Sequence, residues 1–272
     1  MAGKTFLLTG CGSGIGRNTA MALVRRGDRV CATDINAEAL AILCKELGTP
    51  KNLRTELLDV RDPQAWEALV GKLATDWGRV DVVMNIAGYL KPGYVHEESP
   101  EEVHRHFDIN TKGVVFGTQA AARQMLRQGG GHIINIASLA GIAPVPGLNL
   151  YSASKFAVRG YSLSAAMDLA PRGVKLTVIC PDAVQTPMLD LQVDYEQAAM
   201  TFSGNAQALT AEDITRAILQ RALVDAPIEI TLPASRGRIA KLGSAFPGLS
   251  GALLKWLRER GRQQQQKRAQ AR

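Results

Sequence analysis

The stretch Thr5-Phe-Leu-Leu-Thr-Gly-Cys-Gly-Ser-Gly-Ile-Gly16 decides the fold of this 272-residue chain. Residues 5–9 form a short apolar run typical of a buried strand, and residues 18–26 have a helical pattern. Between them, glycines at positions 10, 14 and 16 permit a tight turn and let another molecule approach the backbone. Strand, glycine turn and helix in this order are typical of a pyrophosphate site, where free amides at the helix N-terminus hold the phosphates.

A second strand-like run, residues 29–34, ends in Asp34, about 20 residues beyond the glycine turn. A carboxylate at this place accepts the ribose hydroxyls of an adenosine and repels a 2′-phosphate. No basic residue follows Asp34 immediately, so we expect NAD rather than NADP. Arg17 is the counter-signal, because its guanidinium could reach a phosphate.

Tyr151 and Lys155 stand one helical turn apart in Tyr-Ser-Ala-Ser-Lys. On a helix, this spacing places both side chains on one face. A nearby ammonium favours the phenolate, so we expect the pKa of Tyr151 to be lowered toward the range useful for proton transfer. The alternative is an ordinary pair on a solvated helix, and other motifs decide between the two.

Four further motifs occur in a fixed order: Asp59-Val60, Asn85-Ile-Ala-Gly88, Asn110 within Asp-Ile-Asn-Thr, and Ser138 within Asn-Ile-Ala-Ser. With Thr9 to Gly16 and the Tyr-Lys pair, they make the chain resemble the classical short-chain dehydrogenase/reductase family over roughly residues 4–232. The resemblance implies an α/β fold with a doubly wound, parallel, seven-stranded sheet of Rossmann type in strand order 3-2-1-4-5-6-7.

The resemblance implies a catalytic role for four residues. Tyr151 would be the general acid/base at the substrate oxygen, and Ser138 would hydrogen-bond the same oxygen. Lys155 would lower the tyrosine pKa and bind the nicotinamide ribose. Asn110 would hold a water that links Lys155 to solvent.

The resemblance also implies which residues contact the cofactor. They are Gly10, Ser13, Gly14, Ile15, Gly16, Asp34, Asp59, Val60, Asn85, Ala87, Gly88, Tyr151, Lys155, Pro181, Val184 and Thr186. One departure from the family pattern is Asp182, where glycine is usual after Pro181. If that position needs a positive φ, aspartate fits at a cost; its carboxylate either contacts substrate or is a solvated loop residue.

The remaining apolar runs fit a single α/β domain over residues 1–232. Residues 53–58, 80–84, 132–137, 175–180 and 228–232 are the further expected strands, with room between them for crossover helices. With 46% apolar content, a chain of this length can bury one large core.

Residues 233–272 form a basic extension. From residue 235 onward there are ten Lys or Arg against Glu259, a net charge of +9, so the rest of the chain carries −2 of the overall +7. Apolar residues such as Trp256 and Leu257 lie among these charges. We expect either an amphipathic helix packed on the domain or a neighbouring subunit, or peripheral contact with an anionic membrane, followed by a disordered Gln-rich end. No nucleic-acid motif is present.

Residues 187–202 are rich in Met, Leu, Val, Tyr and Phe and are expected to form an apolar lid, with Tyr89, Leu90 and residues 139–148 lining the same cleft. The substrate would then be a lipophilic secondary alcohol or ketone of steroid, retinoid, long-chain acyl or terpenoid type. The alternative is that these residues merely close the core.

The sequence therefore favours an NAD(H)-dependent oxidoreductase acting on CH–OH groups. An NADPH-dependent ketoreductase and a non-catalytic dinucleotide-binding scaffold or sensor are the alternatives. The four cysteines form no Cys-x-x-Cys pair and the four histidines form no metal motif; no signal peptide or membrane-spanning run is apparent. We expect a cytoplasmic enzyme without a metal site. The resemblance alone implies a homodimer or homotetramer.

Overall fold

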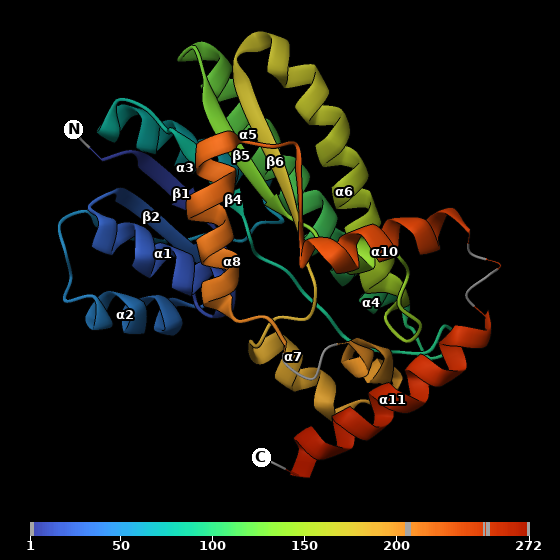
Figure 1. The fold of residues 1–272 in the computed structure, drawn as a ribbon. Coiled ribbons are helices and arrows are strands. Elements are labelled where there is room, and N and C mark those ends of the chain that lie inside the picture. The colour runs from blue at the N-terminus through green and yellow to red at the C-terminus, as the bar shows by residue number, and fades with distance from the viewer. Residues whose placement is uncertain (1–2, 205–207, 247, 249–250, 271–272) are drawn as a thin grey trace.

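One sheet organises the chain. The computed structural model describes residues 3–204, 208–246, 248 and 251–270. Seven parallel strands lie in the order β3-β2-β1-β4-β5-β6-β7, which confirms the doubly wound topology (Figure 1). The strands are β1 (Thr5–Leu8), β2 (Arg29–Asp34), β3 (Leu53–Leu57), β4 (Val82–Asn85), β5 (Gly131–Ile136), β6 (Val174–Pro181) and β7 (Glu229–Leu232).

Helices cover both faces of the sheet. One face packs against α1 (Gly14–Arg26), α2 (Ala37–Glu46) and α8 (Ala211–Ala217). The other packs against α3 (Pro63–Trp77), α5 (Gly113–Arg127) and α6 (Asn149–Leu169). The remaining helices are α4 (Pro100–His106), α7 (Pro187–Leu191), α9 (Leu223–Asp225), α10 (Ala234–Ala245) and α11 (Gly251–Gln270).

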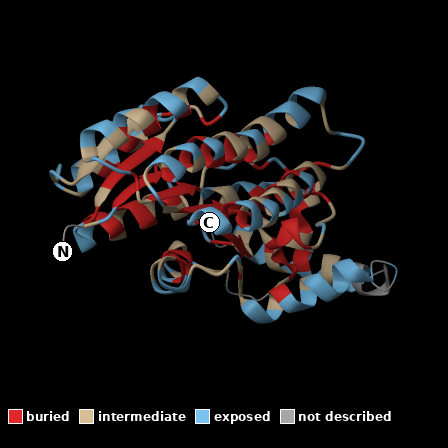
Figure 2. Cartoon of the chain, turned by 90° about the horizontal axis from the view of Figure 1, so that it is seen from above, coloured by how far each residue is buried: buried red, intermediate tan, exposed pale blue. Residues whose placement is uncertain are grey.

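The core has two layers because strand side chains alternate in direction. Phe6 and Leu8 of β1 point to the α1 side and Leu7 to the α3 side, and all three are fully buried. Figure 2 shows buried strands between helices whose outer surfaces are exposed. A strand buried on both faces reads as a continuous apolar run, which is why these strands could be predicted to within two residues at each end.

Local signals fix where the helices begin. Asn36 caps α2 by accepting from the Ala39 amide, and Asp62 caps α3 ahead of Pro63. Ser13, by contrast, makes no side-chain capping bond at the start of α1, and the first turn of α1 has no acidic residue. The first amides of α1 are therefore left for another acceptor.

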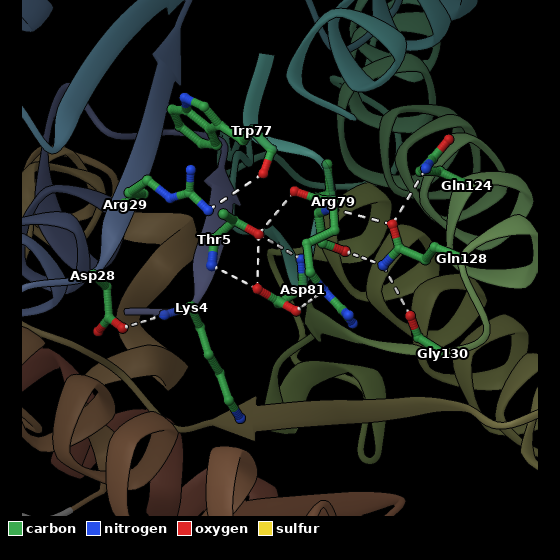
Figure 3. A network of polar contacts seen from close by, with 11 residues as sticks. Lys4, Thr5, Asp28, Arg29, Trp77, Arg79, Asp81, Gln124, Gln128 and Gly130 are labelled. Carbon is green, nitrogen blue, oxygen red and sulfur yellow. Dashed lines mark hydrogen bonds and ion pairs between the residues drawn. The ribbon is translucent and has the colours of Figure 1, made fainter. Parts of the chain in front are cut away.

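A network of hydrogen bonds lies at the amino ends of the strands (Figure 3). The glycine turn lies at the opposite edge of the sheet. The carboxylate of Asp81 accepts from the Thr5 amide at 2.8 Å and from the Thr5 hydroxyl at 2.8 Å. Nearby, the Gln128 side chain donates to the carbonyls of Val80 and Gly130. These bonds join β1, β4 and β5 at the end of the sheet that carries no glycine turn.

The C-terminal extension folds back over the carboxyl edge. Helix α11 packs against a 3₁₀ segment, Glu196–Ser203, that follows α7. The Gln265 carboxamide is buried and donates toward the carbonyls of Gln192, Val193 and Tyr195. These contacts order the Gln-rich end as helix, where disorder was expected. Helix α11 thus packs on the domain, as one of the two alternatives for the extension states.

Candidate active site

A cavity of about 1350 Å³ lies at the carboxyl edge of the sheet. It extends from the glycine turn after β1 to the wall formed by α7, the Glu196–Ser203 segment and α10. The carboxyl edge of a doubly wound sheet is where this class of fold binds ligands. The volume exceeds that of a drug-sized pocket, as a site for a dinucleotide together with a second molecule requires.

The glycine turn has the shape of a phosphate cradle. Gly10 and Gly14 have positive φ values of 69° and 51°. A Cβ at Gly16 would lie 2.1 Å from the Gly10 carbonyl oxygen, so only glycine lets α1 start this close to the turn. With the uncapped first turn of α1 facing the cavity, the residues present fit a bound pyrophosphate.

Asp34 is held in place at the end of β2. Its carboxylate accepts from the Gly12 amide at 2.8 Å and from the Asn36 amide at 3.0 Å, and the residue lines the cavity. Arg17 points elsewhere: its guanidinium forms an ion pair with Glu46 of α2 at 2.5 Å. Asp34 lines the cavity and Arg17 does not; the other charged residues on this side of the lining are Asp59 and Arg61, which form an ion pair with each other.

Ser138 and Tyr151 meet inside the cavity. Ser138 follows β5, accepts from the Ala140 amide and donates to the Pro181 carbonyl. Its hydroxyl also hydrogen-bonds the Tyr151 side chain, which lowers the tyrosine pKa. Burial has the larger, opposite effect and raises the pKa of Tyr151 to about 12. The pKa of Tyr151 in this structure is therefore raised, whereas the sequence led us to expect a lowered pKa.

Lys155 lies beneath Tyr151 on the same face of α6, as the spacing predicts. Its Nζ is 5.7 Å from the Tyr151 ring centroid and donates to the Ile136 carbonyl at 2.9 Å. Burial lowers the pKa of Lys155 to about 8. Among the residues that the structure describes, the Ile136 carbonyl is the one hydrogen-bond acceptor of this ammonium, which lies next to the phenol.

Asn110 lies in a π-helical turn, Phe107–Lys112, between α4 and α5. It is fully buried; its Oδ1 accepts from the Tyr89 amide, and its Nδ2 donates to the Tyr89 carbonyl and the Ser154 hydroxyl. Gly88 separates it from Lys155: a Cβ there would lie 3.5 Å from the Asn110 Oδ1 and 3.7 Å from the Lys155 Nζ. Irregular helical turns of this kind are frequent at functional sites.

Asn85 does not lie where the resemblance implies a cofactor contact. It is 2% exposed and donates to the Asn135 side chain at 2.7 Å, so it joins β4 to β5 inside the core. The backbone that follows it is the part that reaches the cavity. There the Thr9 hydroxyl accepts from the amides of Ile86 and Ala87 and fixes that loop against β1.

Asp182 has no positive φ, so the strain considered for it is absent. Its carboxylate forms an ion pair with Arg236 of α10 at 2.8 Å. Burial raises the pKa of Asp182, and the Arg236 charge opposes that rise. Asp182 is therefore not a solvated loop residue. Asp182 and Arg236 both line the cavity.

The expected lid is partly cavity wall and partly core. Met188, Leu189 and Met200 line the cavity. Val193, Ala198 and Phe202 instead pack in a small core with Leu90 and Leu148. Some residues of this apolar segment thus line the cavity, and others close the core.

The sequence-predicted site residues come together with two exceptions. The residues that line the cavity are Gly10, Ser13, Gly14, Ile15, Gly16, Asp34, Asp59, Val60, Ala87, Gly88, Ser138, Tyr151, Lys155, Pro181, Val184 and Thr186. Asn85 and Asn110 lie behind this wall. Sequence reasoning missed the wall from the extension: Arg236, Ile239, Ala240, Gly243, Ser244 and Leu257. Its basic and apolar pattern gave no signal for a cavity.

Metal and membrane features are absent from what the structure describes. No cluster of His, Cys, Asp or Glu that could hold a metal ion occurs among the described residues. No helix within the described ranges is long and apolar enough to cross a membrane.

Comparison with known proteins is consistent with this geometry. Residues 4–197 match the short chain dehydrogenase family. An NADP-dependent 3-hydroxy acid dehydrogenase of Salmonella typhi is 37% identical over 90% of this chain and 97% of its own. A 3-alpha-(or 20-beta)-hydroxysteroid dehydrogenase of Mycobacterium bovis is 36% identical over 70% of this chain and 72% of its own. The structure of a Burkholderia phymatum short chain dehydrogenase/reductase in complex with NAD superposes with a TM-score of 0.81 and 26% identity, covering 91% of this chain and 95% of that one.

Proposed function

Because the chain belongs to the short chain dehydrogenase family, we propose that it is an NAD(H)-dependent oxidoreductase acting on a lipophilic secondary alcohol or ketone. The observation that carries the proposal is the meeting of Ser138, Tyr151 and Lys155 in one cavity beside the glycine turn. When bound there, NAD supplies the group that accepts hydride from the carbinol carbon.

The side chains divide the proton chemistry between them. The Ser138 hydroxyl and the Tyr151 phenol both contact the substrate oxygen, and in the oxidation direction the phenolate takes the alcohol proton. Lys155 stabilises that phenolate by its charge. In the cofactor-bound enzyme its free donors hold the nicotinamide ribose, while Asn110 fixes the Gly88–Tyr89 backbone beside it.

The NAD preference is supported by Asp34 and by Arg17. The Asp34 carboxylate faces the place of the adenosine ribose, and the Arg17 guanidinium is engaged by Glu46. A 2′-phosphate would meet a fixed negative charge with no free cation from Arg17. The NADP dependence of the Salmonella relative supports the alternative, an NADPH-dependent ketoreductase.

The lipophilic substrate is supported by the apolar side chains that line the cavity beyond Ser138 and Tyr151. Leu139, Val145, Leu148 and Met188 are among them. The named activity of the Mycobacterium bovis relative on hydroxysteroids agrees with a pocket of this character. Oxidation of the alcohol is the proposed cellular direction, because NAD-linked enzymes work against an oxidised cofactor pool.

The test is NAD reduction by the purified protein with a panel of apolar and small polar secondary alcohols, repeated with NADP. We expect turnover of the apolar alcohols with NAD, lost by at least about 100-fold in Tyr151→Phe with NAD binding retained. Turnover of polar alcohols alone would contradict the lipophilic substrate, and a preference for NADP would contradict the role given to Asp34. Biological activity unchanged in Tyr151→Phe would favour a dinucleotide-binding scaffold.

The proposed setting is the cytoplasm, supported by four unpaired cysteines, with a homodimer or homotetramer as the working form. Exposed Ile239 and Leu242 on α10 and Phe246 directly after it, beside Arg238, support peripheral contact with an anionic membrane. Sedimentation with anionic and with neutral vesicles tests the contact, and size-exclusion chromatography with light scattering tests the oligomer. Equal sedimentation with both vesicle types would contradict the electrostatic part.

A further inference from the structure

An arginine from the C-terminal extension enters the substrate end of the cavity, the part beyond Ser138 and Tyr151. Arg236 lies in the first turn of α10 and lines the cavity. Its Nη1 lies 2.8 Å from a carboxylate oxygen of Asp182, directly after Pro181. The backbone at Gly204 lies close to the same nitrogen, since a Cβ there would clash with Nη1. The guanidinium is therefore held by Asp182 and lies against the backbone at Gly204.

Part of this guanidinium has no partner. Asp182 is the one hydrogen-bonding or ion-pairing partner of Arg236 among residues 3–204, 208–246, 248 and 251–270. The Arg236 side chain is 34% exposed, and Arg236 contributes to the cavity wall. A guanidinium presents five N–H donors in a planar fork, and the ion pair accounts for Nη1 alone. The other donors have no acceptor among the residues that the structure describes.

The charges that line this end of the cavity favour an anion. Besides Lys155 beneath Tyr151, the charged lining residues that the proposed cofactor site does not use are Arg105, Arg236 and one acid, Asp182, which is paired with Arg236. Arg105 stacks over the Tyr89 ring at 4.3 Å and forms no ion pair among the described residues. In a cavity with apolar walls an excess of one sign concentrates ligands of the other sign.

We propose that Arg236, held by Asp182, is a specificity residue that binds the carboxylate of the substrate, so that the preferred substrate is an amphipathic hydroxy acid with an apolar chain. This inference rests on the proposed function and narrows its substrate class. The apolar wall contacts the chain of such a molecule, Ser138 and Tyr151 its hydroxyl group, and Arg236 its acid group. Asp182, placed where the family usually has glycine, orients the guanidinium and leaves its other donors for the ligand.

The experiment compares a series of hydroxy carboxylates of increasing chain length with their methyl esters, in the intact enzyme with saturating NAD. Arg236→Met keeps an unbranched, mostly apolar stem and removes the guanidinium with its charge. We expect its kcat/KM to fall by about 10- to 100-fold for the best carboxylate, mainly through KM, and by less than about threefold for the matching ester. Arg236→Lys should lie between the two, because it keeps the charge and loses the fork.

Arg238→Met is the matched control, since this residue lies on the exposed side of the same helix and does not line the cavity. Arg238→Met should leave kcat/KM unchanged for both the carboxylate and the ester. A second readout is calorimetric binding of a saturated carboxylate and of its amide to the NAD-bound protein, with Arg236→Met weakening only the carboxylate.

Equal losses for acid and ester, or unaltered carboxylate binding in Arg236→Met, would overturn the inference while leaving the dehydrogenase proposal intact. Absence of turnover with every alcohol and either cofactor would overturn the proposed function instead. The binding experiment then still decides whether Arg236 holds a carboxylate.

Discussion

The carboxylate of Asp34 accepts a hydrogen bond from the backbone amide of Gly12 at 2.8 Å. A Cβ at position 12 would lie 2.9 Å from the same carboxylate oxygen, so the contact depends on glycine within the turn. The end of β2 and the glycine turn are thereby joined through one side chain. Under the proposed function, the residue that selects the cofactor also holds the shape of the turn.

Replacing Asp34 should change the cofactor preference. In Asp34→Ser we expect KM for NAD to rise about tenfold or more and the ratio of NADP to NAD efficiency to rise by a larger factor, because the repulsion of a 2′-phosphate is gone. Adding Glu46→Gln releases Arg17 from its ion pair and should raise the NADP efficiency further. Steady-state kinetics with both cofactors measures this. No gain from Glu46→Gln in the double variant would show that Arg17 cannot reach the phosphate.

Removing Lys155 should make turnover depend steeply on pH. Burial raises the pKa of Tyr151 to about 12, and without the lysine charge only a small phenolate fraction exists near neutrality. We expect Lys155→Met to lose about 100-fold or more in alcohol oxidation at pH 8. The loss should shrink above pH 8, because burial lowers the pKa of Lys155 to about 8 and the wild-type lysine then loses its charge as well. Lys112→Met, on an exposed surface, is the control; a pH-independent loss would contradict the electrostatic role.

Gln265 should matter for the substrate more than for the cofactor. In Gln265→Leu three carbonyls after α7 lose their donor, at a cost of about 1–3 kcal/mol in the free energy of unfolding. We expect KM for the substrate to rise severalfold, NAD affinity to stay unchanged, and residues 187–204 to be cleaved faster in limited proteolysis. Gln266→Leu, one residue further and exposed, should do none of this. Equal effects of the two variants would show that the helix acts only through its bulk.

His132 should make the fold less stable in mild acid. Burial, aided by the charges of Lys175 and Lys4, lowers its pKa from 6.5 to about 4. Because the unfolded chain takes up the proton first, stability present at neutral pH falls as the pH drops from 6.5 toward 4, by up to about 3 kcal/mol. Urea unfolding of the wild type and of His132→Gln, which keeps a partner for Thr177, measures this at several pH values. His104→Gln, exposed on α4, should behave as wild type, and an unchanged pH dependence in His132→Gln would contradict the assignment.

Much of the fold and site could be predicted from the sequence because the signals are local. Runs such as residues 29–34 are buried on both faces, and the spacing of Tyr151 and Lys155 is a helical turn. What could not be predicted depends on contacts between distant segments. The inward turn of Asn85 needs its partner Asn135, and the raised tyrosine pKa follows from burial by the whole fold. The cavity wall from α10 and the ordered Gln-rich helix depend on Asp182 and on the carbonyls after α7.

Two parts of the chain contribute to the cavity: the catalytic domain and the C-terminal extension. The residues predicted to bind the cofactor or to act on the substrate oxygen lie between positions 10 and 186, whereas Arg236, Ile239, Ala240, Gly243, Ser244 and Leu257 of the wall come from the extension. Exchange of the extension between relatives would therefore redirect the enzyme to new molecules without disturbing its redox chemistry. A single recombination point near β7 would be enough to exchange this part of the cavity wall.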